Sequence, residues 1–132
     1  GNNRTYMIRV PDPGRFELRL MDGSANPYLL QAGVIAAGLH GMNNRIDPGE
    51  PLACNMYTDY KNYPNLKKLP NEIDDALEQL EQSKEIKEAF GEDAINSYVK
   101  LKKSEIENFD KDENFDKNSP VTDWEKKNTL DC

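Results

Sequence analysis

Charged and apolar residues alternate strictly in the run Arg-Phe-Glu-Leu-Arg-Leu at residues 15–20. Successive side chains of a β-strand point to opposite faces, so Arg15, Glu17 and Arg19 share one face. Phe16, Leu18 and Leu20 share the other. The pattern predicts a strand with one face suited to a core and one suited to anions or a metal ion. A solvent-exposed face of salt bridges explains the periodicity equally well.

The arginines of this chain are concentrated near its beginning. All five lie in the first 45 residues, which contain no lysine, and all twelve lysines lie at Lys61 or later. Arginine carries a planar fork that binds carboxylates and phosphates through two hydrogen bonds. A general need for solubility would not separate the two residue types in this way. The distribution favours an anion-binding role for the first segment.

Charge and hydropathy narrow the class of protein. Residues 71–132 carry eighteen acidic residues against nine lysines, which argues against a nucleic-acid surface. The longest apolar stretch, Tyr28 to Leu39, is too short to span a bilayer. Two cysteines, Cys54 and Cys132, are too few and too far apart to imply a disulfide framework. We expect a cytoplasmic protein with neither a nucleic acid nor a membrane as its partner.

The order of local signals predicts an α+β chain. Residues 4–10 and 15–20 form two strands, and the turn-rich run 11–14 favours a hairpin between them. Asn26-Pro27 begins a helix that Gly41 ends. That helix is apolar nearly all round and needs burial, which points to a missing domain or to neighbouring subunits. A start at Gly1 without methionine likewise suggests an internal segment.

The residues alone leave the chemistry of the charged face incomplete. Glu17 can bind a divalent cation, but such ions need several oxygen ligands, so its partners are expected upstream of Gly1. Arg4 and Arg9 are five residues apart and have opposite strand parity. Both reach one site only if Arg4 precedes the strand or a bulge intervenes.

Five motifs carry a resemblance to a known family. They are Asn-Arg-Thr, Ile-Arg-Val-Pro, Arg-Phe-Glu-Leu-Arg, Asp-Gly-Ser-Ala-Asn-Pro-Tyr-Leu and Ala-Gly-Leu-His-Gly-Met, in this order within residues 2–57. Their order and spacing resemble the C-terminal part of the glutamine synthetase catalytic domain. The amino-acid sequence of these motifs is most similar to that of the bacterial glutamine-synthetase-like branch, which also contains γ-glutamylmethylamide synthetases.

The resemblance implies a fragment of that catalytic domain. Its N-terminal β-hairpin would belong to a larger catalytic sheet, and a mainly helical C-terminal segment would follow. The implied divisions are active-site strands at 1–25, a buried helix at 26–42, a loop at 43–70 and a helical C-terminus at 71–132.

The resemblance also implies roles for the charged residues. Glu17 matches the glutamate that ligates the Mg²⁺ or Mn²⁺ ion bound to the ATP phosphates. Arg19 matches the arginine that contacts the γ-carboxylate of the glutamate substrate. Arg4, Arg9 and Arg15 match arginines on the ATP side. Arg19 and Arg4 are therefore the expected catalytic residues.

The implied reaction is the ATP-dependent ligation of ammonia to glutamate through γ-glutamyl phosphate, with this chain inactive alone. Methylamine or another small amine is the alternative acceptor, and a non-catalytic assembly or binding protein is a second alternative. The family's homo-oligomeric rings imply a ring here, with a dodecamer expected.

The chain departs from the family pattern at two places. Many relatives carry a lysine between the two strand motifs, and residues 11–14 contain none. One ATP contact is therefore absent or supplied elsewhere. Tyr57 aligns with a tyrosine that some enteric relatives adenylylate, but the residues after it differ, so local packing is the favoured interpretation.

Overall fold

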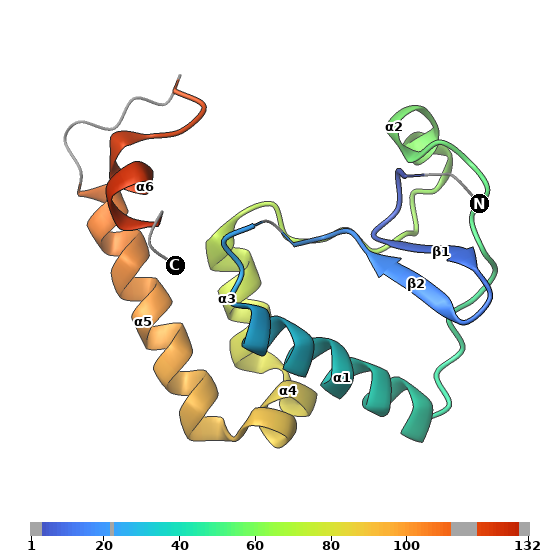
Figure 1. Cartoon of the computed structure of the whole chain (residues 1–132), viewed down its shortest axis with the longest axis horizontal. Coiled ribbons are helices and arrows are strands. Elements are labelled where there is room, and N and C mark those ends of the chain that lie inside the picture. Colours follow the sequence, from blue (N-terminus) through green and yellow to red (C-terminus); the bar gives the residue numbers. More distant parts are fainter. Residues whose placement is uncertain (1–3, 22, 112–118, 130–132) are drawn as a thin grey trace. The chain divides into compact units, whose positions relative to one another are not determined.

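The protein is represented by a computed structural model that describes residues 4–21, 23–111 and 119–129. Two strands come first in the chain and are followed by helices (Figure 1). The elements are β1 (Ile8–Asp12), β2 (Arg15–Leu18), α1 (Pro27–Asn43), α2 (Met56–Asp59), the 3₁₀ helix η1 (Tyr60–Asn62), α3 (Ile73–Gln82), α4 (Lys84–Phe90), α5 (Glu92–Asp110) and α6 (Asp123–Asn128). The α+β class is confirmed.

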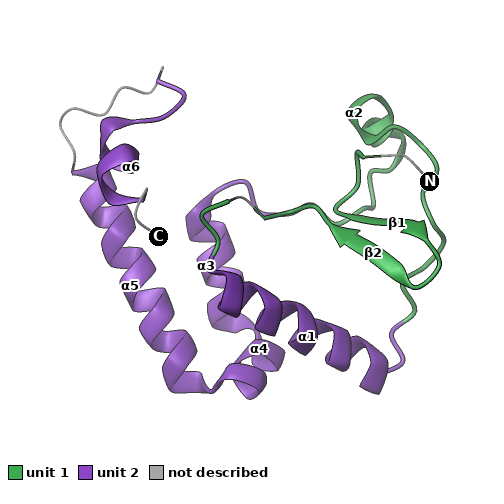
Figure 2. Cartoon of the chain, in the orientation of Figure 1, with its two compact units in different colours: residues 1–25, 47–69 green, residues 26–46, 70–132 purple. Residues whose placement is uncertain are grey.

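The chain divides into two compact units, which Figure 2 shows in different colours. The first unit consists of residues 1–25 and 47–69 and contains the hairpin, α2 and η1. The second consists of residues 26–46 and 70–132 and contains the other helices. The predicted hairpin and the predicted helical C-terminus therefore belong to different units.

The hairpin of the first unit is antiparallel and turns at Pro13-Gly14. Gly14 has a φ of 79°, a conformation that suits glycine after proline in a type II turn. The expected four-residue connection is shorter in the structure, because Pro11 and Asp12 belong to β1. Both strands are also shorter than expected, since β1 starts at Ile8 and β2 ends at Leu18.

The rest of the first unit is less irregular than expected. Within residues 43–70, which the sequence indicated as loop, the structure has the helical turns α2 and η1. Asn55 begins α2, because its side-chain oxygen accepts a hydrogen bond of 3.1 Å from the backbone N–H of Tyr57. On the apolar side of β2, Phe16 remains 56% exposed. The core expected for this face is not supplied by the described residues.

Helix α1 opens the second unit with the expected cap. The side chain of Asn26 accepts hydrogen bonds from the N–H groups of Tyr28 and Leu29, at 3.0 and 3.1 Å. The helix passes through Gly41 and ends at Asn43, because Asn44 supplies the cap. Both the backbone N–H and the side-chain amide of Asn44 donate to the carbonyl of His40. The end predicted at Gly41 is therefore wrong.

No described residue of α1 is buried, although its sequence is apolar. Tyr28 is 83% exposed and Met42 76%. Burial of this helix against further parts of the protein stays a prediction. None of the described helices combines the length and hydropathy needed to cross a bilayer.

The core of the second unit lies between α3 and α5. Leu77, Ile95 and Val99 are buried there, and other apolar side chains pack against them: Leu80, Ile86, Phe90 and Ile106. Gly91, with a φ of 88°, allows the sharp change of direction from α4 to α5. Trp124 of α6 packs edge-on against Phe109, with ring centroids 5.3 Å apart.

We expect Leu77→Ala to lower the free energy of unfolding of the helical unit by about 2–5 kcal/mol, because it opens a cavity at a side chain that is 4% exposed. Urea denaturation followed by circular dichroism measures this change. Gln79→Ala on the exposed side of α3 is the matched control and should change stability by no more than about 0.5 kcal/mol. Equal losses in the two variants would contradict the assignment of this core.

Candidate functional site

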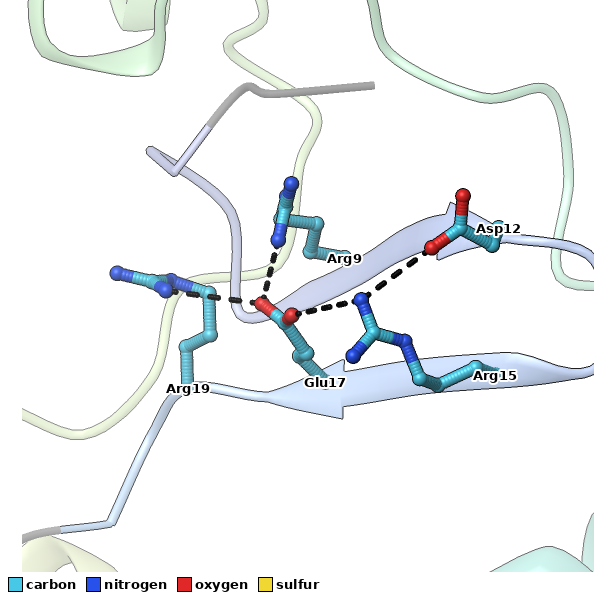
Figure 3. Close-up of polar contacts among 5 residues, drawn as sticks. All are labelled: Arg9, Asp12, Arg15, Glu17 and Arg19. Atoms are coloured by element: carbon cyan, nitrogen blue, oxygen red, sulfur yellow. Dashed lines mark hydrogen bonds and ion pairs between the residues drawn. The ribbon is translucent and has the colours of Figure 1, made fainter.

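A single carboxylate on the hairpin lies among three guanidinium groups (Figure 3). One oxygen of Glu17 lies 2.7 Å from Nη1 of Arg9 and 3.9 Å from Nη1 of Arg19. The other oxygen lies 3.6 Å from Nη2 of Arg15. The charged face predicted from the alternating sequence is therefore formed.

The pairing of the strands places Arg9 in this cluster. Arg9 and Glu17 are direct partners in the antiparallel register, so their side chains stand on the same face. Arg15 and Arg19 flank Glu17 along β2, two residues away on either side. Beyond β2, the backbone N–H of Arg19 donates to the carbonyl of Met7 at 2.8 Å, which extends the pairing toward the start of the chain.

A register shift lies between Arg9 and Asp12, where β1 has one more residue than β2. The shift brings Asp12 opposite Arg15, and their side chains form an ion pair of 3.3 Å. Arg15 thus contacts two carboxylates and remains 60% exposed, whereas the side chain of Arg9 is only 12% exposed. The cluster has one guanidinium fixed against Glu17 and a second that is open to a ligand.

The surrounding charges change the acidity of Glu17. The hydrogen bond from Arg9 is the main reason why the pKa of the Glu17 carboxyl lies below its ordinary value. Partial burial opposes this shift, and the positive charges of Arg9, Arg15 and Arg19 add to it. The carboxylate is therefore held ionised, as an oxygen ligand or an ion-pair partner must be.

Arg4 lies outside the cluster in the described part of the chain. It precedes the first residue of β1 and is exposed. The alternation of a strand, which would place Arg4 and Arg9 on opposite faces, therefore does not apply to Arg4. No ion pair joins it to Glu17 among the described residues. Of the five expected site residues, the structure brings together Arg9, Arg15, Glu17 and Arg19.

The cluster could supply one ligand for a metal ion but not a complete site. Among the residues that the structure describes, no group of three or more His, Cys, Asp or Glu side chains could hold a metal. Mg²⁺ and Mn²⁺ prefer several oxygen ligands. Glu17 fits as one of them, since its carboxylate is ionised and one oxygen has only the longer contact to Arg15.

A second set of contacts, between residues 5–6 and 54–56, was not predicted from the sequence. Cys54 donates from its backbone N–H to the hydroxyl of Tyr6 at 2.7 Å, and that hydroxyl donates back to the Cys54 carbonyl. The backbone N–H of Met56 donates to the hydroxyl of Thr5 at 3.0 Å. These bonds join segments 48 and 51 residues apart, and no periodicity or local motif indicates such a pair.

Known proteins resemble this chain over nearly its whole length. The sequence profile described as glutamine synthetase, catalytic domain, matches residues 1–127. A glutamine synthetase of Rhizobium meliloti (strain 1021) is 46% identical over 131 residues, which are 99% of this chain and 28% of that protein. A glutamate–methylamine ligase of Methyloversatilis universalis is 38% identical over 135 residues, and the match again covers 99% of this chain and 28% of that protein.

The structure agrees with these similarities. A solved structure described as a GmaS/ADP complex superposes on this chain with a TM-score of 0.78 at 40% sequence identity. The match covers 100% of this chain and 28% of the chain in that structure. A γ-glutamylethanolamide synthetase of Streptomyces coelicolor is 36% identical over 98% of this chain and 26% of that protein. The chain thus spans somewhat more than a quarter of the relatives it matches.

We expect Arg9→Gln to raise the pKa of Glu17, because it removes the hydrogen bond that contributes most to the lowered value. In the wild-type chain, this ion pair stabilises the hairpin above the ordinary glutamate pKa of about 4.3, and the contribution is lost as the pH falls through the lower folded pKa. NMR titration of the side-chain carboxyl carbons measures the shift.

Arg45→Gln is the control for this titration, because Arg45 belongs to the second unit and not to the hairpin. It should leave the pKa of Glu17 unchanged. An unchanged titration in Arg9→Gln would mean that the ion pair does not control Glu17.

Proposed function

The chain belongs to the glutamine synthetase family, and on this premise we propose that its protein ligates an amine to glutamate with ATP. Ammonia is the proposed amine, which makes glutamine the product and γ-glutamyl phosphate the intermediate. The arrangement that supports the proposal most directly is Glu17 with its three guanidinium groups. A reaction that brings together a triphosphate, a carboxylate and a metal ion needs this combination of charges.

Four arginines near the start of the chain have proposed roles. Arg9 and Arg15, together with Arg4, bind the phosphates of ATP, where guanidinium groups form paired hydrogen bonds. Arg19, beyond the end of β2, binds the γ-carboxylate of glutamate and the acyl phosphate formed from it. Arg19 and Arg4 therefore act on the transferred group, Arg19 from the carboxylate side and Arg4 from the phosphate side.

The proposed reaction proceeds in two displacements. A γ-carboxylate oxygen of glutamate attacks the terminal phosphorus of ATP, and the bond to the bridging oxygen breaks to release ADP. The nitrogen of the amine then attacks the acyl carbon, loses a proton and expels phosphate. The phosphate carries away one oxygen that began in glutamate. Negative charge develops on the transferred group in both steps, and fixed guanidinium groups stabilise it without reorganising.

Glu17 is the proposed ligand from this chain for Mg²⁺ or Mn²⁺. The ion would supply charge neutralisation at the ATP phosphates when bound. Arg9 holds the carboxylate of Glu17 ionised and in place, and the remaining ligands would come from residues outside this chain.

Two other functions stay open beside this one. Methylamine or another small amine is the second proposed acceptor, since relatives named glutamate–methylamine ligase and γ-glutamylethanolamide synthetase are 38% and 36% identical to this chain. A non-catalytic assembly or binding protein is disfavoured, because Glu17 and Arg19 are both present. A ring-shaped homo-oligomer, such as a dodecamer, stays a prediction that light scattering of the full-length protein tests.

The test of the proposal is ADP release by the full-length protein with ATP, Mg²⁺ and glutamate, in the presence of ammonia, methylamine or ethanolamine. Faster turnover with ammonia supports glutamine synthesis, and faster turnover with either other amine supports the alternative ligase. The absence of turnover with all three amines would leave the non-catalytic function as the better account.

For the full-length protein, we expect Arg19→Ala to lower kcat/KM for glutamate by about 100-fold, because a charged donor to the transferred group is lost. Initial rates of ADP release at varied glutamate measure this effect. Arg45→Ala removes an arginine outside the hairpin and should leave the rates within about twofold. Near-normal activity of Arg19→Ala would disprove its role.

Glu17→Gln should raise the Mg²⁺ concentration needed for half-maximal activity by at least about 10-fold. Loss of a residue that only orients a metal ligand already weakens metal binding by about this factor, and Glu17 is the proposed ligand itself. The matched control is Asp12→Asn, which also converts an acid of the hairpin to its amide. A metal dependence that shifts equally in both variants would mean that Glu17 contributes only charge.

A further inference from the structure

The hydroxyl of Tyr6 connects two distant segments of the first unit. It accepts from the backbone N–H of Cys54 at 2.7 Å and donates to the carbonyl of the same residue. The adjacent bond from the N–H of Met56 to the hydroxyl of Thr5 measures 3.0 Å. Residues 5–6 and 54–56 all belong to one compact unit, shown in a single colour in Figure 2. We call these three bonds the Tyr6 clamp.

The Tyr6 clamp holds backbone that the hairpin ladder does not reach. β1 starts at Ile8, so the residues before it are not fixed by strand pairing, apart from the bond that Met7 accepts from Arg19. Tyr6 lies between Arg4 and Arg9, two residues after the first and three before the second. Arg9 is already held by the pairing of β1 with β2 and by Glu17, so the position of the backbone at Tyr6 affects mainly the direction of Arg4.

We propose that Tyr6 is a positioning residue, whose hydroxyl fixes the approach to β1 on segment 54–56 and so aligns Arg4 for the nucleotide phosphates. This inference rests on the proposed function, because it needs a nucleotide to bind at Arg4. It goes further in making nucleotide affinity depend on a tyrosine whose hydroxyl bonds to the backbone of a segment 48 residues away.

The state of the hydroxyl suits this task. Burial, followed by the hydrogen bond with the Cys54 thiol, raises the pKa of Tyr6 above its ordinary value, and the hydrogen bond with the Cys54 backbone only partly offsets this rise. The hydroxyl thus stays protonated at neutral pH and can donate to the carbonyl while it accepts from the N–H. A tyrosine is long and rigid enough to do both across two segments.

The clamp contacts the backbone of Cys54, and this provides a sharp control. Tyr6→Phe removes the hydroxyl and both bonds but keeps the ring. Cys54→Ala keeps the N–H and the carbonyl and removes only the thiol, whose sulfur lies 3.5 Å from the hydroxyl. The proposal therefore predicts a large difference between two small substitutions at the same contact.

The experiment measures ADP binding by calorimetry and the KM values for ATP and glutamate in the full-length protein. We expect Tyr6→Phe to raise the Kd of ADP and the KM of ATP roughly 3- to 10-fold, the range expected for loss of one or two hydrogen bonds. The KM of glutamate should change less than about twofold, because the side chain of Arg19 lies against Glu17 and makes none of the bonds of the clamp. Cys54→Ala should resemble the wild type in all three constants.

Thr5→Val tests the same clamp through its other bond, and it replaces Tyr6→Phe if that variant does not fold. It removes the acceptor of the Met56 N–H and should weaken ADP binding in the same direction. Unchanged ADP binding in the variant that folds would overturn the proposal. An equal loss for ADP and glutamate would make the clamp merely structural and would also overturn it.

The failure of the proposed function would be seen separately, in the wild-type protein. A wild type that neither binds ADP nor releases it from ATP would overturn the proposed function and, with it, this inference. A wild type that does both, together with a Tyr6→Phe variant of equal affinity, would overturn the inference alone.

Discussion

The ion pair between Arg9 and Glu17 organises the candidate site. Its 2.7 Å contact joins the two strands across the charged face, and the other arginines of the cluster are arranged around the same carboxylate. Glu17 and Asp12 supply two carboxylates among three guanidinium groups, which leaves a net positive charge, so the face attracts anions while Glu17 stays ionised. This excess of positive charge makes the hairpin suitable for phosphate and carboxylate chemistry, and the ion pair keeps its parts in register.

The sequence predicted those parts of the structure that depend on local physics. The period-two alternation placed Arg15, Glu17 and Arg19 on one face, and Asn26-Pro27 marked the start of α1, because side-chain direction and capping are decided within a few residues. The arrangement of Arg9 opposite Glu17 depends on a two-residue turn and a register shift, which the alternation does not specify. The Tyr6 clamp was also unpredictable, since its partners are 48 residues apart.

The described residues expose apolar surfaces, and the chain spans only part of the length of its relatives. Helix α1 buries none of its described residues, and Phe16 of β2 is 56% exposed, whereas Leu77, Ile95 and Val99 form a small core elsewhere. The chain spans about 28% of the glutamine synthetase and glutamate–methylamine ligase it resembles. If Glu17 is a metal ligand as proposed, the site would need further ligands from residues outside this chain.

The central claim is that the hairpin serves a ligase that activates the γ-carboxylate of glutamate by phosphorylation. The most direct measurement supplies glutamate labelled with ¹⁸O in its γ-carboxylate to the full-length protein with ATP, Mg²⁺ and the preferred amine. Mass spectrometry then determines the isotope content of the phosphate released. The account predicts one ¹⁸O atom in each phosphate formed. Unlabelled phosphate released together with the amide product would contradict it.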